Sequence, residues 1–175
     1  MTSVLVGYAT AHGSTRSIAE RIAARLSDGG LRAVTRPLEA LTAADLDAYD
    51  AYVVGSAVHD MAWLPEARRF TDAHGAALAR HPLWIFSVGM ADAVPGPRDR
   101  VAALEERKIT GKLVERLHPR GRRLFSGVIA PEHLTVPGRL KMKAMGIRYG
   151  DYRDWDAVDA WAAEITAALG SAEAA

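Results

Sequence analysis

Small hydroxylated residues gather near the N-terminus, in the stretch Thr10-Ala11-His12-Gly13-Ser14-Thr15-Arg16-Ser17. Hydroxyls and closely spaced backbone N–H groups are the donors that a bound anion needs once water has been displaced. Gly13 would let the backbone approach such a ligand closely. These residue types therefore predict a cradle for a phosphate group, and the simpler alternative is a helix cap that holds no ligand.

The residues on either side of this stretch predict the elements that hold it. Val4-Leu5-Val6-Gly7-Tyr8 is an apolar run with strand-forming residues, and from Ser14 to about Leu26 apolar residues recur at helical spacing. A strand that leads through a short loop into a helix presents the free N–H groups and the positive end of the helix dipole to the loop. Arg16 either adds a formal charge to this site or lies on the outer surface of the helix.

The rest of the chain alternates between strand and helix patterns. Further strands are expected over 31–36, 50–55, 83–88 and 123–129, and further helices over 41–46, 64–80, 101–117 and 154–169. The fourth helix, 101–117, is expected to be interrupted or frayed near Gly111. Residues 131–150 are expected to be irregular or only partly helical. We expect one domain over 1–170 and a frayed tail over 171–175.

Five strands that alternate with five helices predict an α/β fold with a doubly wound, five-stranded parallel sheet between two helical layers. The favoured strand order is 2-1-3-4-5, which places a switch point beside the first strand, where the carboxyl ends of strands 1, 3 and 4 meet. A ligand should therefore lie across the loops Thr10–Arg16, Ser56–Trp63 and Ser87–Asp92.

Several other site classes lack their sequence signatures. The chain has no Walker A motif, no G-x-G-x-x-G fingerprint, no G-x-S-x-G elbow and no acidic pair after the first strand. It has no cysteine, which excludes disulfides and thiolate-bound metals. We expect no metal, because the remaining histidines lack metal-ligand spacing: His74, His81, His118 and His133. We also expect no nucleic acid partner.

The run Thr10-Ala11-His12-Gly13-Ser14-Thr15 resembles the flavin-phosphate loop of the flavodoxin family, which has the form T/S-x-x-G-x-T. That family binds FMN, with the phosphate at this loop and the isoalloxazine ring between the loops after strands 3 and 4. Val54–Val58 and Phe86–Gly89 stand where those two loops begin. The stretch 150–155, GDYRDW, which precedes a helix containing Trp161, resembles a subgroup that includes the quinone-dependent protoporphyrinogen oxidases.

The resemblance implies FMN as the cofactor and a set of residues that bind it. They are Thr10, Ala11, His12, Gly13, Ser14, Thr15 and Arg16 in the phosphate loop, and Ser56, Ala57, Val58, His59, Trp63, Ser87, Val88, Gly89, Met90 and Asp92 in the ring loops, with Met61 as a further candidate. Trp63 either stacks on the flavin or faces the core. His59 either bonds the ring or is a solvated loop histidine.

The charge distribution bears on the partner. The net charge is +1, but residues 98–148 carry 13 Lys/Arg against 5 Asp/Glu, a net +8. In Pro131–Gly150 basic and apolar residues interleave, which suits an anionic amphiphile such as a propionate-bearing tetrapyrrole, or an anionic membrane that holds quinone. The alternative is a solvated basic loop.

These features predict an FMN-dependent oxidoreductase, resembling the protoporphyrinogen oxidases, that passes electrons from a porphyrinogen or another reduced substrate to a quinone. A strongly acidic surface is typical of carrier flavodoxins, whereas this chain has a pI near 8.1. An electron-carrier flavodoxin and an interaction domain without a working cofactor remain the alternatives. The expected location is cytoplasmic, with peripheral contact at the inner face of the membrane as an open option.

Overall fold

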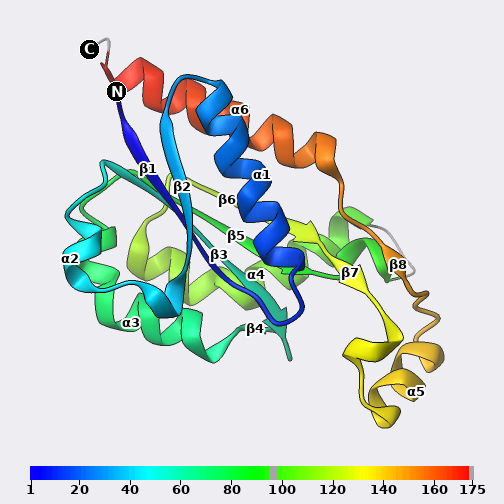
Figure 1. Ribbon diagram of the computed structural model, residues 1–175. Helices are drawn as coiled ribbons and strands as arrows, with labels where there is room; N and C mark the ends of the chain where they lie inside the picture. The colour runs from blue at the N-terminus through cyan, green and yellow to red at the C-terminus, as the bar shows by residue number, and fades with distance from the viewer. Residues whose placement is uncertain (95–97, 174–175) are drawn as a thin grey trace.

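A parallel sheet of five strands runs through the centre of the protein, and helices cover both of its faces (Figure 1). The computed structural model describes residues 1–94 and 98–173. The strands lie in the order β2-β1-β3-β5-β6, with bounds β1 Ser3–Ala9, β2 Arg32–Pro37, β3 Ala51–His59, β5 Leu83–Gly89 and β6 Gly121–Ser126. All four neighbouring pairs are parallel. This order is the predicted 2-1-3-4-5, so the predicted doubly wound α/β fold is confirmed.

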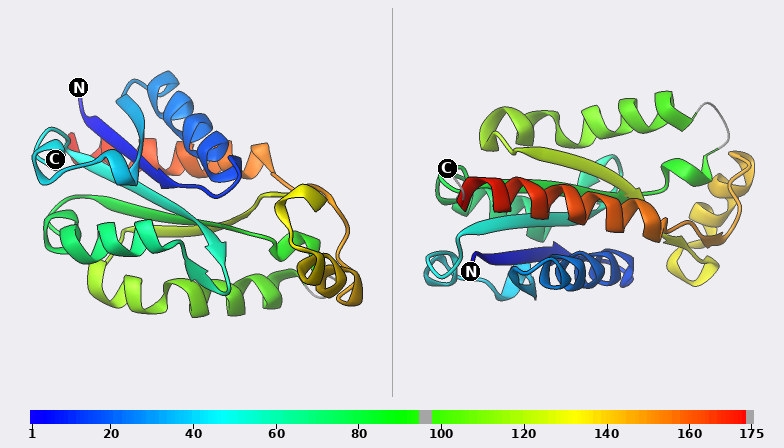
Figure 2. Two further views of the ribbon diagram at one scale, coloured as in Figure 1. Left: turned by 60° about the horizontal axis from the view of Figure 1, so that its bottom comes forward. Right: turned by 90° about the horizontal axis from the view of Figure 1, so that it is seen from above.

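Two helical layers bury the two faces of the sheet. Helices α1 (Ser14–Asp28) and α6 (Trp155–Glu173) cover one face, and α2 (Ala43–Leu46), α3 (Pro65–Leu78) and α4 (Arg98–Leu117) cover the other, as the left view of Figure 2 shows for α3 and α4. The apolar stripe of α1, which includes Ile18, Ile22 and Leu26, is fully buried against the sheet. Short 3-10 turns lie at η1 (Leu38–Ala40), η2 (Ala91–Ala93) and η3 (Pro131–His133).

The predicted fifth strand, 123–129, is wrong at both ends. It begins earlier, at Gly121, and it leaves the sheet after Ser126. Gly127 marks the break: its N–H donates to the Gly89 carbonyl at 3.0 Å, and its carbonyl accepts from Tyr152 N at 3.1 Å. A Cβ at this position would lie 3.0 Å from Val88 Cγ1 and 3.1 Å from Ser14 Cβ. The next residues form β7 (Val128–Ile129), which pairs with β8 (Gly150–Asp151) in a separate antiparallel ribbon.

Other boundaries also differ from expectation. Helix α4 is continuous across Gly111, so the predicted interruption or fraying is wrong, because one glycine inside a long helix costs only about 1 kcal/mol. Helix α6 runs to Glu173, so three residues of the predicted tail lie in it, while 174–175 fall outside the described residues. Residues 95–97 also fall outside them.

A short hairpin that the sequence did not reveal follows β3. Strand β4 (Ala62–Trp63) pairs antiparallel with Val58 and His59, and the two-residue turn between them is Asp60-Met61. Both turn residues have positive φ, 48° and 60°, as a two-residue type I′ hairpin turn requires. The usual Asn-Gly or Asp-Gly signature is absent here, so the turn could not be recognised from residue types.

Residues 131–149 form a small lobe beyond the carboxyl edge of the sheet (Figure 1). It contains η3 and helix α5 (Val136–Ala144), in agreement with the prediction of partial helix. Thr135 caps α5, since its Oγ1 accepts from Gly138 N at 3.3 Å. Ile129 and Ile147 pack against Ala93 in a third apolar cluster, which fixes the lobe to the turn after β5.

Candidate functional site

A cavity of about 560 Å³ opens at the carboxyl edge of the sheet, within the usual size range of small-molecule sites. The three predicted loops contribute to its wall. Of the predicted cofactor residues, eleven line it: Thr10, Ala11, His12, Ser14, Thr15, Ala57, Val58, His59, Val88, Gly89 and Met90. The topology thus brings residues from β1, β3 and β5 to one place, as the strand order requires.

The loop after β1 is built to expose backbone donors. Gly13 has a left-handed φ of 93°, and its N–H donates to Thr10 Oγ1 at 2.9 Å, which closes a tight turn. Helix α1 begins directly afterwards, and the Gly13 carbonyl accepts its first hydrogen bond from Ser17 N at 3.0 Å. The N–H groups of residues 14–16 therefore have no acceptor within the helix, and together they form an anion site at its positive end.

Three hydroxyls complete this cradle. Thr15 is fully buried (0% exposed), and its Oγ1 has no hydrogen-bond partner among the residues that the structure describes. Thr10 Oγ1 accepts from Gly13 N and Ser14 Oγ accepts from Val128 N at 3.1 Å, so each keeps its own proton for a ligand. A buried hydroxyl without a hydrogen-bond partner costs free energy unless a ligand accepts its proton. A phosphate oxygen is such an acceptor.

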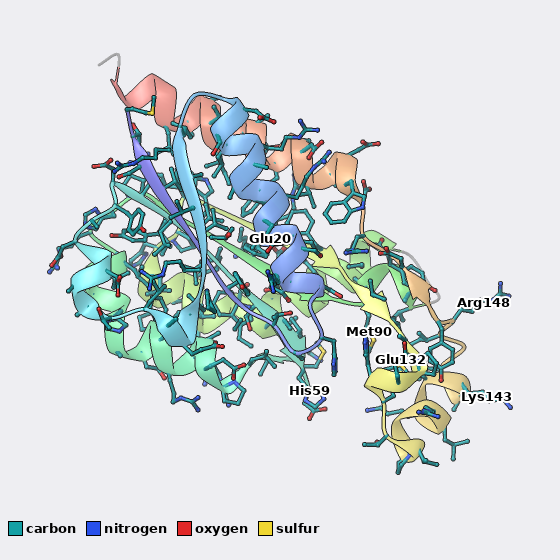
Figure 3. The ribbon with its side chains drawn as sticks, viewed as in Figure 1. Glu20, His59, Met90, Glu132, Lys143 and Arg148 are labelled. Carbon is teal, nitrogen blue, oxygen red and sulfur yellow. The ribbon has the colours of Figure 1, made fainter. Side chains whose placement is uncertain are left out.

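The next part of the cavity is a slot with largely apolar walls. Ala57, Val58 and Met61 of the β3–β4 hairpin form one side, and Gly89 and Met90 at the carboxyl end of β5 form another. Figure 3 shows His59 at the tip of the hairpin, where its Nδ1 lies 3.4 Å from Asp60 Oδ2. Both side chains are strongly exposed, which matches the solvated alternative for His59. Apolar walls suit a flat heteroaromatic ring.

Four predicted cofactor residues lie beside this slot rather than in its wall. Trp63 is 2% exposed, and its Nε1 donates to Ser87 Oγ at 2.8 Å, so the core-facing alternative is the one observed and the stacking expectation is corrected. Ser56 Oγ accepts from Leu64 N at 3.0 Å. Asp92 N donates to Ser126 Oγ at 3.0 Å, and that hydroxyl donates to Asp92 Oδ2. These contacts fix the loops that form the slot.

Arg16 points away from the cradle. Its Nε pairs with Glu20 Oε1 at 2.8 Å one turn along α1, and both side chains are exposed. The outer-surface alternative is therefore the one observed, and the positive character of the cradle comes from backbone dipoles instead. Gly13 contributes the turn geometry described above rather than a wall of the cavity.

The stretch before α6 that resembles the oxidase subgroup holds that helix against the cradle. The Arg153 guanidinium donates to Ser17 Oγ at 2.8 Å, pairs with Asp151 and lies 4.9 Å from the centre of the Trp155 ring. Asp154 Oδ1 caps the start of α6 through Ala157 N at 3.0 Å. In this structure the stretch therefore positions α1 and α6, and it contributes no cavity wall.

The sequence missed one side of the cavity, which comes from β7 and the lobe. Its residues are mostly apolar, with one lysine and one histidine: Gly127, Val128, Ile129, Ala130, His133, Leu134, Lys141, Met142 and Met145. The interleaving of basic and apolar residues in 131–150 pointed to this segment but not to the side chains that face inward. Met142 is half-buried and packs on the Ile129–Ile147 cluster, which turns this face of α5 toward the cavity.

Two histidines from distant parts of the chain meet at the cradle. The rings of His12 and His133 stack in parallel, with centroids 4.1 Å apart and planes 2° apart. His133 Nδ1 is buried and has no hydrogen-bond partner in the described part of the chain. Partial burial of the His12 ring, and then the proximity of His133 and His59, lower the pKa of His12 below its usual value.

Comparisons with solved structures show where this architecture recurs. Rubredoxin:oxygen oxidoreductase from Desulfovibrio gigas aligns with a TM-score of 0.68 and 14% identity over 100% of this chain, which spans 38% of that one. A cysteine-to-serine mutant of flavodoxin from Pseudomonas aeruginosa aligns with a TM-score of 0.57 and 19% identity over 96% of this chain and 99% of that one. At these identities the likeness shows the fold alone.

Sequence-based comparisons give the family. A search of curated proteins finds no match. A family profile described as flavodoxin domain matches residues 5–154, which is most of the chain and includes the cradle, the slot and the lobe. The protein therefore belongs to the flavodoxin domain family.

Proposed function

We propose that the protein is an FMN-dependent oxidoreductase that binds an amphiphilic substrate beside its flavin. Membership of the flavodoxin family indicates FMN as the cofactor. One observation carries the rest: the cavity continues past the slot into an apolar lobe lined by Leu134, Met142 and Met145, with Lys141 at its side. An electron carrier has to expose its flavin edge to a partner protein, and it needs no such lobe.

The cradle and the slot fit FMN in different ways. The amides of residues 14–16 and the hydroxyls of Thr10, Ser14 and Thr15 would hold the phosphate, and the β3–β4 hairpin with Gly89 and Met90 would hold the ring. FMN supplies the redox chemistry, while the protein sets orientation, water access and charge around it. Titrating the cofactor-free protein with FMN should quench flavin fluorescence in a 1:1 ratio (an expectation for one cradle per chain), whereas absence of binding would contradict the proposal.

For the substrates, we propose a porphyrinogen or a similar reduced ring compound as donor and a quinone as acceptor. Methionine side chains adapt to flat apolar molecules of different shape, and Lys141 can pair with a carboxylate. The FMN-loaded protein should oxidise protoporphyrinogen anaerobically in the presence of a menaquinone analogue. Replacement of Lys141 by Met should raise KM for the carboxylate-bearing donor with little change in kcat, because the charge binds the substrate rather than the reacting atoms.

Absence of turnover in a flavin-loaded preparation would favour the carrier alternative. A carrier would then be recognised by reversible one-electron reduction of its flavin and by electron exchange with a partner reductase. The interaction-domain alternative would be recognised by failure to bind FMN at all.

The outer face of α5 suggests where the protein meets its surroundings. Val136 and Leu140 are 78% and 70% exposed, and the exposed Lys143 and Arg148 lie on the same lobe (Figure 3). No helix in the described ranges is both long and apolar enough to cross a bilayer. Exposed apolar residues between cations match an anionic membrane surface, so we propose peripheral membrane contact through Pro131–Gly150, which also gives access to quinone.

Charge reversal on this lobe tests the membrane contact. The double variant Lys143→Glu and Arg148→Glu should lose most co-sedimentation with vesicles that contain phosphatidylserine at low salt, since each cation near such a surface contributes about 1 kcal/mol. The matched control is Arg68→Glu with Arg69→Glu, which changes the same charge on the exposed face of α3. Equal binding of both variants and the parent protein would rule out this contact.

A further inference from the structure

We propose that His12 and His133 act as one proton-binding unit of the phosphate site, which takes up a proton when the phosphate of FMN binds. This inference rests on the proposed FMN binding and adds a recognition residue, His133, from outside the three loops of the fold. Its basis is the stacked pair itself, because one ring belongs to the cradle and the other to the lobe.

The geometry places both rings at the cradle. His12 lies between Thr10 and Gly13 in the turn that exposes the backbone donors, and its ring lies 4.1 Å from that of His133 in a parallel stack. His133 ends η3, and its Nδ1 is buried without a partner among the described residues. Both histidines line the same cavity as Thr15, whose hydroxyl is also buried without a partner. Buried polar atoms without partners, from two segments of the described chain, thus belong to residues that line one cavity.

The stack can hold one proton readily but not two. An imidazole can stack on an imidazolium, whereas two imidazolium rings at this distance would repel each other strongly. In the free protein, burial and the neighbouring rings lower the pKa of His12, which disfavours the protonated form of its ring. The His12–His133 pair can therefore bind one proton, but in the free protein no negative charge beside the rings, among the described residues, stabilises it.

The charged groups around the pair do not supply that charge. His59 from the end of β3 and Lys141 from α5 face the same cavity and oppose protonation. The Asp60 carboxylate favours protonation of the pair, but it is strongly exposed and already lies beside His59. Glu132 is an exposed chain neighbour of His133, and Arg139 holds the η3 backbone through the Pro131 carbonyl at 2.8 Å. A phosphate that is close to doubly ionised at pH 7 would shift this balance toward the protonated pair.

Calorimetric titration of the cofactor-free protein with FMN, at pH 7 in two buffers of different ionisation enthalpy, measures the protons taken up. We expect on the order of half a proton for each FMN bound, and a Kd that rises relative to that of a His133→Phe variant between pH 6 and pH 8. The sign follows because a group whose pKa rises on binding strengthens binding at low pH and loses that effect as the pH rises. The phenylalanine keeps a flat stacking ring but cannot titrate.

Riboflavin provides the control that needs no variant. It carries the same ring without the phosphate, so its binding should take up no proton and its Kd should not follow the FMN profile. His12→Asn should remove the proton uptake as His133→Phe does. Equal proton uptake with FMN in the parent protein and in both variants would overturn the histidine proposal while FMN binding stands. Failure of the parent protein to bind FMN would overturn the proposed function and this inference together.

Discussion

At the scale of single residues, the hydroxyl of Thr15 is the strongest indication that the cradle binds a phosphate group. It is the side chain of a fully buried residue with no partner in the described part of the protein, a state that costs free energy in the absence of a ligand. Sequence reasoning predicted it as a cradle residue, and the structure places it in the wall of the cavity, because residue types and loop placement suffice for that much. It could not foresee the partnership of His12 with His133, since that contact depends on how a lobe of irregular structure folds back.

Replacing Thr15 by Val should therefore separate binding from stability. FMN affinity should fall about 10- to 100-fold, because a hydrogen bond to a charged phosphate contributes about 1.5–3 kcal/mol. The free protein should unfold at the same or a higher urea concentration, since the valine removes an unsatisfied hydroxyl. The control is Thr71→Val in α3, where the buried hydroxyl bonds the Arg68 carbonyl at 3.0 Å. A Thr15 variant with normal FMN affinity would contradict the phosphate assignment.

At the scale of elements, the β3–β4 hairpin is held by a buried tryptophan rather than by the cofactor. Helical and strand periodicity predicted the sheet and its helices, because long buried elements repeat their pattern many times. Periodicity could not predict a two-residue strand or the direction of Trp63, which depends on the single bond from its Nε1 to Ser87 Oγ. The same limit applies to β7, where a break at one glycine redirects the chain.

The Trp63→Phe variant tests this role. It should lower the free energy of unfolding by about 1–3 kcal/mol, through loss of the bond to Ser87 and incomplete filling of the core. FMN should still bind, with an affinity lowered only through the loosened hairpin, because Trp63 holds a wall of the slot but does not itself line the cavity. Urea denaturation and fluorescence titration measure the two effects. A large loss of FMN affinity at unchanged stability would instead support stacking of the tryptophan on the flavin.

At the scale of the whole molecule, one carboxylate clamps the two helices on the same face of the sheet. Asp159 of α6 accepts from Arg21 Nε at 2.6 Å and from Arg25 Nη2 at 2.8 Å, both on α1. These hydrogen bonds hold the pKa of Asp159 well below its usual range. The clamp joins the cradle helix to the end of the chain, a contact that neither helix reveals by its own pattern.

Asp159→Asn should accordingly weaken the protein most at neutral pH. The stabilisation by Asp159 is complete above the usual aspartate pKa of about 3.9 and is lost as the pH falls below it, because the unfolded chain then binds a proton that the folded one does not. The urea midpoint of the variant should lie below that of the parent at pH 7, and the gap should begin to narrow as the pH falls below about 4. Asp156→Asn, an exposed position on the same helix, should show no such convergence.

The ribbon of β7 and β8 has a consequence for how the protein could be altered. Ile129 and Gly150 lie opposite each other in that ribbon, so residues 130–149 leave and return at one narrow neck. Residues 130–149 can therefore be exchanged as a unit. A two-residue Asn-Gly turn could replace them without altering the register of the main sheet. The shortened protein should remain folded and bind riboflavin, while substrate turnover and vesicle binding disappear, as circular dichroism, titration and assay would measure. Exchange of this segment would then change the substrate specificity and remove His133, while the backbone donors and hydroxyls of the cradle stay in place.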